Sequence, residues 1–318
     1  MLSMIKRMAF VAAIASGSMA MAAVQVDPAL PTYAPAQGVS GSIKSVGSDT
    51  LNNLMTGWAE DFKKTYPNVS VEIEGKGSAT APPALIQGTS QLGPMSRPMK
   101  SSEIDEFKAK YNYPPIAVRT AVDALAVFVH KDNPIKSLSM DQVKAIFSVE
   151  GKDMTWGDLG LEGEWADKPV SLYGRNSASG TYGFFKEHAL GKKDFKATVK
   201  EQPGSSAVVQ GVASDKFAVG YSGIGYATAD VRAVPISGKD GKAVEANAEN
   251  SYAGTYPLSR FLLVYVNAEP GKEPTPIVRE FIKYILSQQG QQTVVKDGYF
   301  PVVKRVVDAD LKALSIQP

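Results

Sequence analysis

The sequence predicts an α/β fold divided between two domains, and two features of the chain carry that prediction. From residue 42 onward, short apolar runs alternate with segments of helical periodicity, which is the pattern of strands and helices in succession. The chain also has 318 residues, and single hydrophobic cores stop growing at roughly 250–300 residues. Two domains are therefore expected.

The apolar runs give the expected strands, and the segments between them give the helices. Apolar residues from Leu51 to Phe62 fall on one face at a period of 3.6. Ser139 and Gln142 form a capping box at the start of a second helix, and Pro276 opens a third that extends to residue 285. The expected strands are residues 42–46, 69–74, 91–95, 116–130, 169–173, 217–221, 233–236 and 259–266.

Two of the apolar runs are long for strands. Residues 120–130 and 259–267 both exceed the usual five or six residues. Each could cross from one domain to the other, or each could be a long strand inside one sheet. If they cross, the first lobe comprises residues 42–125 plus 261–318, and it encloses a second lobe at residues 126–260.

The first 22 residues have the pattern of a signal peptide. Lys6 and Arg7 precede an apolar run of about eight residues, and residues 20–22 (AMA) fit a cleavage site. The alternative is an N-terminal core helix. Residues 23–41 contain several prolines and are expected to be flexible. The chain has no cysteine, which removes the acceptor of a lipid anchor, so we expect a periplasmic or secreted monomer.

The composition excludes several classes of function. A formal net charge of +2 supplies no basic field for nucleic acid. Without cysteine there is no disulfide, thiol nucleophile or thiolate metal site. The two histidines, His130 and His188, cannot form a metal cluster alone. We therefore expect no cofactor, no metal and no enzymatic activity, although a triad assembled in space remains conceivable.

Three polar turns, each between a strand end and a helix start, could bind an anion. They are residues 47–50 (GSDT), 75–80 (GKGSAT) and 174–181 (GRNSASGT). A helix start presents unpaired N–H groups and a partial positive charge. Serine and threonine hydroxyls add donors, and Arg175 can pair with two oxygens at once. Taken singly, each turn is more simply a helix cap; together they favour an oxyanion site.

Competing motifs fail on spacing. Residues 174–181 lack the lysine and the glycine spacing of a phosphate-binding P-loop. Residues 75–77 (GKG) lack the third glycine of a dinucleotide fingerprint, and Ser222 does not lie in a G-x-S-x-G elbow.

The motifs resemble the PstS-type phosphate-binding proteins of ABC transporters, which have the type II periplasmic-binding-protein fold. The resemblance extends over roughly residues 42–303, and its most specific part is RNSASGT at residues 175–181. Residues 47–50, 77–78, 95–98 (MSRP) and 122–127 (VDALAV) are also similar. The resemblance implies two α/β lobes hinged by two crossing strands, phosphate in the interlobe cleft, and delivery to a permease in the inner membrane.

The resemblance also implies a set of ligand-binding residues. Thr50 and Leu51 would donate at a helix start, Ser78 would donate a hydroxyl, and Arg175 would pair with phosphate oxygens. The complete expected set is Ser48, Asp49, Thr50, Leu51, Ser78, Ser96, Arg97, Asp123, Arg175, Ser179, Gly180 and Thr181.

One position departs from the family. Many members have an aspartate after the serine of the motif at Ser96, where it accepts the proton of phosphate, but this chain has Arg97. Arg97 would instead add positive charge near the anion. Asp123 is the first candidate for the missing acceptor and Asp49 the second, while Asp123 could equally be a structural partner of Arg97 or Arg175. Binding of another oxyanion, sulfate or molybdate, therefore stays open, as does a secreted phosphatase.

Overall fold

A computed structural model describes residues 24–238 and 240–317 of the chain. Nine strands of the described residues form one continuous sheet. The strands of its main path, in spatial order, are β2 (Val69–Glu74), β1 (Gly41–Val46), β3 (Leu92–Met95), β12 (Ser259–Val266), β4 (Ile116–His130), β8 (Ala218–Gly223), β6 (Ser171–Arg175) and β7 (Lys200–Gln202), with β9 (Val231–Ala233) paired to β4.

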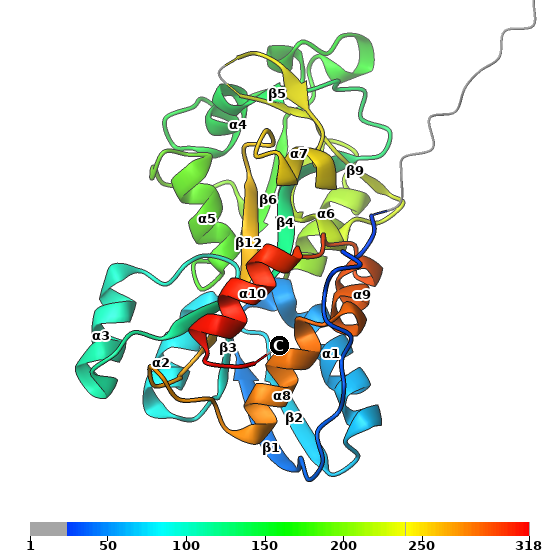
Figure 1. Cartoon of the computed structure of the whole chain (residues 1–318). Helices are drawn as coiled ribbons and strands as arrows, with labels where there is room; N and C mark the ends of the chain where they lie inside the picture. Colours follow the sequence, from blue (N-terminus) through cyan, green and yellow to red (C-terminus); the bar gives the residue numbers. More distant parts are fainter. Residues whose placement is uncertain (1–23, 239, 318) are drawn as a thin grey trace, which may run out of the picture.

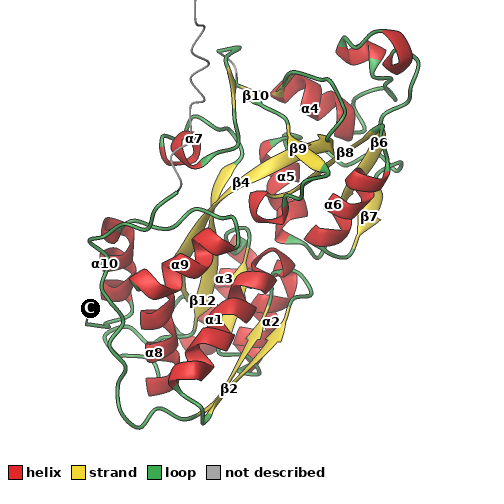
Figure 2. Ribbon diagram, turned by 90° about the vertical axis from the view of Figure 1, so that its right-hand side faces the viewer, coloured by secondary structure: helices red, strands yellow, loops and turns green. Residues whose placement is uncertain are grey.

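Lobe 1 is built on the β2-β1-β3-β12 end of this sheet and contains most of the larger helices (Figures 1 and 2). Its core is aromatic: Phe62 packs edge-to-face on Phe281, with ring centroids 5.1 Å apart, and Trp58 is fully buried beside them. The helices are α1 (Asn52–Thr65), α2 (Ala81–Gln87), α3 (Ser101–Tyr111), α8 (Pro276–Ile285), α9 (Gln288–Lys296) and α10 (Lys304–Ala313).

Lobe 2 is built on the β8-β6-β7 end and a small sheet of β11 (Ala243–Val244), β10 (Ile236–Ser237) and β5 (Leu138–Ser139). Phe185 stacks on Tyr221 at 4.0 Å, and Phe147 meets both rings edge-on. The helices are α4 (Met140–Phe147), α5 (Gly180–His188), α6 (Ser205–Ser214) and α7 (Ala248–Tyr252), with short 3-10 turns at Gly157–Leu159 and Gly163–Trp165.

Strand β4 passes from one lobe to the other (Figure 1). Its first part pairs with β12 through Ala124, and its second part pairs with β8 from Leu125 onward. Ala121 packs in the core of lobe 1 and Leu125 in that of lobe 2. The chain returns near the start of β12, where Leu258 packs in lobe 2 and Leu262 in lobe 1. The two long apolar runs thus lie where the two cores meet.

Residues 26–40 differ from the expectation of a flexible segment, because they run along lobe 1 in close contact with it (Figure 1). Leu30 is only 2% exposed and belongs to the core of lobe 1. The Tyr33 hydroxyl is hydrogen-bonded to the Tyr66 hydroxyl at 2.6 Å and to the Glu280 carboxylate at 3.0 Å. Apolar and aromatic side chains between the prolines account for this packing. The expected signal peptide, residues 1–22, lies outside the described residues.

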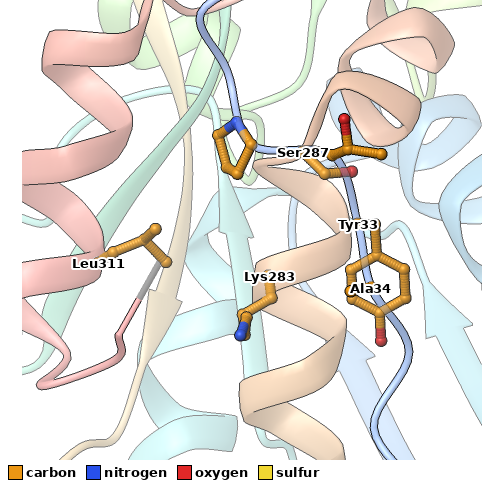
Figure 3. A pocket seen from close by; sticks show the side chains of 7 residues that line it. Tyr33, Ala34, Lys283, Ser287 and Leu311 are labelled. Carbon is orange, nitrogen blue, oxygen red and sulfur yellow. The ribbon is translucent and has the colours of Figure 1, made fainter.

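A small cavity lies between this segment and α8 (Figure 3). Its volume is about 80 Å³, and its lining includes Tyr33, Lys283 and Leu311. None of the expected site residues contributes to it. In the described ranges, no helix is both long and apolar enough to cross a membrane.

Candidate anion-binding site

The three polar turns come together between the lobes. The Gly77 N–H donates to the Gly47 carbonyl oxygen at 2.8 Å, which joins the first two turns within lobe 1. The Ala79 N–H donates to the Ala178 oxygen at 3.1 Å, and this bond reaches the third turn in lobe 2. All three turns follow strand ends, β1, β2 and β6, so the sheet itself brings them to one place.

Five hydroxyl groups form a buried hydrogen-bonded group at this meeting point, here called the hydroxyl cluster. Ser96 is its centre, since its Oγ lies 3.0 Å from that of Ser48 and 3.3 Å from those of Ser78 and Thr181. The Thr50 and Thr181 hydroxyls share a 2.8 Å bond across the lobes. Each of the five side chains belongs to a residue no more than 2% exposed.

Two glycines allow the turns to approach this closely. Gly77 has a φ of +116°, and a Cβ there would lie 2.5 Å from the Ala178 oxygen. A Cβ on Gly180 would lie 2.2 Å from Ser78 Oγ and 2.7 Å from Ser96 Oγ. Any larger residue at Gly180 would therefore displace the hydroxyl cluster or separate the lobes.

Two hydroxyls at this site, those of Ser179 and Ser78, accept hydrogen bonds from backbone N–H groups. Ser179 is the N-cap of α5, and its Oγ accepts from the N–H groups of Thr181 and Tyr182 at 3.1 and 3.3 Å. Ser78 Oγ accepts from the Ser96 N–H at 3.0 Å. A hydroxyl has two acceptor lone pairs and one O–H donor. With lone pairs occupied by N–H groups, these side chains offer mainly their protons, which suits an anion.

Arg175 ends β6 in a fully buried position, with 1% of its side chain exposed. Its Nη1 donates to Ser205 Oγ at 2.6 Å and lies 3.2 Å from an Asp49 oxygen, and its Nη2 donates to the Pro203 carbonyl. Burial lowers the pKa of Arg175, although Asp49 opposes this. Its Nε is buried and has no hydrogen-bond partner among the described residues. A buried N–H without an acceptor is costly, so it marks a place for one.

Asp49 is held by lobe 2 although it belongs to a lobe 1 turn. Its Oδ1 accepts from the Ser205 N–H at 2.7 Å, at the start of α6. Its carbonyl oxygen accepts from the Tyr226 hydroxyl at 2.9 Å. The carboxylate is thus a cap for α6 and a partner of Arg175, rather than a member of the hydroxyl cluster.

Asp123 and Arg260 form an ion pair behind the hydroxyl cluster. Asp123 is fully buried, and its Oδ2 accepts from Arg260 Nε and Nη2 at 2.9 and 2.7 Å. Its Oδ1 accepts from the Ile224 N–H at 3.0 Å. Arg260 also donates to Thr181 Oγ1 and to the Ser96 carbonyl oxygen, at 2.9 and 2.8 Å. Asp123 is therefore the partner of Arg260, and neither Arg97 nor Arg175 is bound to it.

Sequence reasoning missed Arg260, although a signal for it exists. Arg260 is the only charged residue of β12, and Asp123 interrupts a long apolar part of β4. A lone charge in a buried strand needs a counter-charge, and the β12–β4 register places these two residues opposite each other. That register is not visible in the sequence.

Arg97 was expected to add positive charge near the anion, and its contacts differ from that expectation. Its guanidinium makes a two-pronged contact with Glu103 of α3, at 2.8 and 2.7 Å, and donates to the Pro98 oxygen. Burial alone would raise the pKa of Glu103, but the hydrogen bonds from Arg97 and the Lys100 N–H lower it on balance. Arg97 is thus neutralised by Glu103. Leu51 packs in the core of lobe 1, so only its backbone could face a ligand.

The three arginines beside the cluster are each matched by one carboxylate. The pairs are Arg97 with Glu103, Arg175 with Asp49, and Arg260 with Asp123. Side-chain charge around the hydroxyl cluster therefore sums to about zero. An anion here would be held by directed donors and by the starts of α5 and α6, rather than by excess positive charge.

Two lobes on one sheet, with a donor-rich buried cluster where they meet, define a two-lobed binding protein. Residues 32–289 match the PBP superfamily domain. The phosphate-binding protein PstS of Pseudomonas aeruginosa is 57% identical over 314 residues, which cover 96% of this chain and 97% of that protein. PstS of Staphylococcus haemolyticus is 31% identical, with 87% and 86% covered.

The solved structures agree on the fold. A protein of Clostridium perfringens, described as a phosphate ABC transporter substrate-binding protein and crystallised with bound phosphate, is 30% identical with a TM-score of 0.71. The alignment covers 82% of this chain and all of that one. An ABC-type phosphate transport receptor from Vibrio cholerae, 24% identical with a TM-score of 0.65, has the same fold. The chain belongs to the PstS family of phosphate-binding proteins, and the type II periplasmic-binding-protein fold predicted from the sequence is confirmed.

Proposed function

We propose that this chain binds inorganic phosphate between its lobes and delivers it to the permease of an ABC importer. The observation that carries the proposal is the pair of buried donors at the meeting of the turns. Arg175 Nε has no hydrogen-bond partner among the described residues. Within the same part of the chain, the Ser179 hydroxyl accepts from two N–H groups, and its own proton is left for a ligand. An oxyanion supplies the missing acceptors to both. The phosphate-binding relatives support phosphate as that ion.

The strength of such a site is adequate for a scavenging protein. Hydrogen bonds to a charged group contribute about 1.5–3 kcal/mol each. Half a dozen of them would provide micromolar affinity, about −8 kcal/mol, after the costs of desolvation and lobe closure. The donors proposed are the hydroxyls of Thr50, Ser78, Ser179 and Thr181, together with Arg175 and backbone N–H groups at the helix starts.

Binding requires the lobes to move. The Thr50 and Thr181 hydroxyls lie 2.8 Å apart, which is a direct hydrogen bond and leaves no room for an ion between them. Phosphate would enter when the lobes separate about β4 and β12, and it would replace these hydroxyl–hydroxyl bonds with hydroxyl–phosphate bonds. Such a hinge motion is common in two-lobed binding proteins.

The same proposal has consequences for where the protein works and what it contacts. We propose that the mature chain works in the periplasm as a monomer after removal of residues 1–22, and that the lobe surfaces dock on the permease. It would bind phosphate without transforming it. The lobe boundaries that we propose remain 42–125 plus 261–318 for lobe 1 and 126–260 for lobe 2.

Equilibrium titration tests the proposal. The purified protein, freed of bound phosphate, is titrated calorimetrically with phosphate, sulfate and molybdate at two pH values. Micromolar or tighter binding of phosphate, with sulfate and molybdate at least about tenfold weaker, supports it. Preference for sulfate or molybdate would move the chain to another oxyanion, and turnover of a chromogenic phosphate ester would make it a phosphatase.

A further inference from the structure

We infer that Arg260 is a positioning residue of the phosphate site, which holds the Thr181 hydroxyl as a hydrogen-bond donor toward the bound anion. This inference rests on the proposed function. It concerns a residue at the start of β12 that lies outside all three polar turns.

The geometry places Arg260 between the hinge and the ligand-binding turns. Only 3% of its side chain is exposed. Its Nη2 donates to Thr181 Oγ1 at 2.9 Å and its Nη1 to the Ser96 carbonyl oxygen at 2.8 Å. Nε and Nη2 donate to Asp123. One guanidinium thereby joins both crossing strands, β4 and β12, to the end of β3 and the start of α5.

The chemistry of a hydroxyl explains what this contact does. Thr181 Oγ1 can accept hydrogen bonds as well as donate one. When a guanidinium N–H occupies the acceptor side, the O–H is left to donate, and the unprotonated oxygens of phosphate are acceptors for it. A cationic donor also withdraws electron density from the oxygen, which strengthens the bond that the O–H makes. Arg260 therefore acts on the ligand through Thr181.

The contact also depends on how the lobes are arranged. Thr181 belongs to α5 in lobe 2, whereas the Ser96 carbonyl that holds the other arm of Arg260 belongs to lobe 1. Arg260 lies at the crossing between the lobes, so its guanidinium joins Thr181 of lobe 2 to Ser96 of lobe 1. The two bonds can be complete together only when the lobes are together. Closure would then orient the Thr181 proton at the moment the anion is enclosed.

Asp123 fixes the guanidinium in this role. Its two bonds to Oδ2 set the plane of the Arg260 side chain, and its charge offsets that of Arg260. A lysine at position 260 would keep the charge but, as a point donor, could not bridge Asp123, Ser96 and Thr181 with the same geometry.

A double-mutant cycle on phosphate affinity tests the inference. The variants are Arg260→Gln/Asp123→Asn, which removes the pair without leaving a buried charge, Thr181→Val, and the triple combination. We expect about a tenfold loss of affinity for each of the first two. We expect the triple variant to lose about tenfold as well, rather than about a hundredfold, because Arg260 acts through Thr181.

Two further variants keep the result interpretable. Arg260→Lys keeps the positive charge opposite Asp123 and can be used if the Arg260→Gln/Asp123→Asn variant folds poorly. Its phosphate affinity should lie between those of the wild type and the Thr181→Val variant. Arg119→Gln is the matched control: Arg119 lies on β4 and pairs with Asp310 of α10, with no bond to the hydroxyl cluster, so its phosphate affinity should equal that of the wild type.

The outcomes separate the two claims. Wild-type affinity in the Arg260→Gln/Asp123→Asn variant, or additive losses in the triple variant, would overturn the role of Arg260 while leaving phosphate binding intact. Failure of the wild-type protein itself to bind phosphate would instead remove the proposed function.

Discussion

Arg260 of β12 and Asp123 of β4 are directly opposed in the antiparallel register of the two strands that connect the lobes. Their side chains form a buried ion pair, with only 3% of one and none of the other exposed. The two residues lie 137 positions apart in the sequence. It places an arginine next to the hydroxyl cluster and a carboxylate behind it, which changes the role expected for Asp123.

Asp123→Asn should weaken phosphate and sulfate by similar factors. If Asp123 accepted the proton of phosphate directly, its replacement would favour sulfate, which carries no proton at neutral pH. Because the carboxylate instead holds Arg260, we expect both anions to lose affinity together, by a few-fold to about tenfold. The same variant should lower the free energy of unfolding by about 3 kcal/mol, since it leaves a buried arginine without its counter-charge.

Calorimetric titration and urea unfolding measure the two effects. A clear gain of sulfate relative to phosphate in Asp123→Asn would show that Asp123 faces the ligand.

Arg175→Ala should reduce phosphate affinity by at least about tenfold while the protein stays folded. The variant removes the Nε donor that has no partner among the described residues, and one charge-assisted hydrogen bond corresponds to roughly that factor. Arg97→Gln is the comparison, because Arg97 is bound to Glu103; its effect should stay below about threefold. Equal affinities for Arg175→Ala and the wild type would remove Arg175 from the site.

Gly180→Ala should impair binding by steric means. The new Cβ would meet the hydroxyls of Ser78 and Ser96 at 2.2 and 2.7 Å, so the turn of lobe 2 could not seat against lobe 1. We expect affinity to fall by about a hundredfold or more with little change in secondary structure, since Gly180 has no positive φ to lose. Gly238→Ala, whose Cβ would meet only an ordinary contact at 3.7 Å, is the control. Unchanged binding in Gly180→Ala would mean that the lobes close differently.

Asp297 should make stability depend on pH. Burial raises the pKa of this carboxyl to about 6, and its Oδ2 has no hydrogen-bond partner among the described residues. Folding therefore favours the protonated form, so its contribution to stability is complete below the usual pKa of 3.8 and is lost as the pH rises through about 6.

Asp297→Asn should accordingly stabilise the protein at pH 8 but hardly at pH 3.5. We expect a gain of about 1 kcal/mol at pH 8, less than the full pKa shift implies, because the residue is only partly buried. Thermal unfolding of both proteins at the two pH values gives the difference. An equal Tm shift at both would show that ionisation of Asp297 is not responsible.

The sequence predicted those parts of the fold whose signals are local. Strands β2, β4 and β12 have the expected bounds because apolar residues, alternating in β2 and nearly continuous in β4 and β12, mark each of them along its length. The capping box at α4 is present, with Ser139 and Gln142 bonded in both directions. Strands β5, β7 and β11, of two or three residues each, were not foreseen, since so short a strand is defined by its neighbour rather than by its own residues.

The sequence was enough to predict the three turns of the candidate site, but not the ion pairs around it. The convergence of residues 47–50, 75–80 and 174–181 followed from their common position after strand ends. Which carboxylate meets which arginine depends on strand register, on the turn before α3 and on contacts between the lobes, none of which the sequence shows. For that reason Arg97 was assigned to the anion and Arg260 was overlooked. Where each arginine around a site is paired with a carboxylate, net charge alone does not reveal the site.

The central claim is that one tetrahedral anion is held jointly by the three turns and Arg175. A crystal structure of the protein grown with phosphate tests it most directly. The account predicts one phosphate ion with oxygens within about 3.2 Å of Arg175 Nε and of the Ser78, Ser179 and Thr181 hydroxyls. Phosphate bound elsewhere on the molecule, with Arg175 Nε still lacking an acceptor, would contradict it.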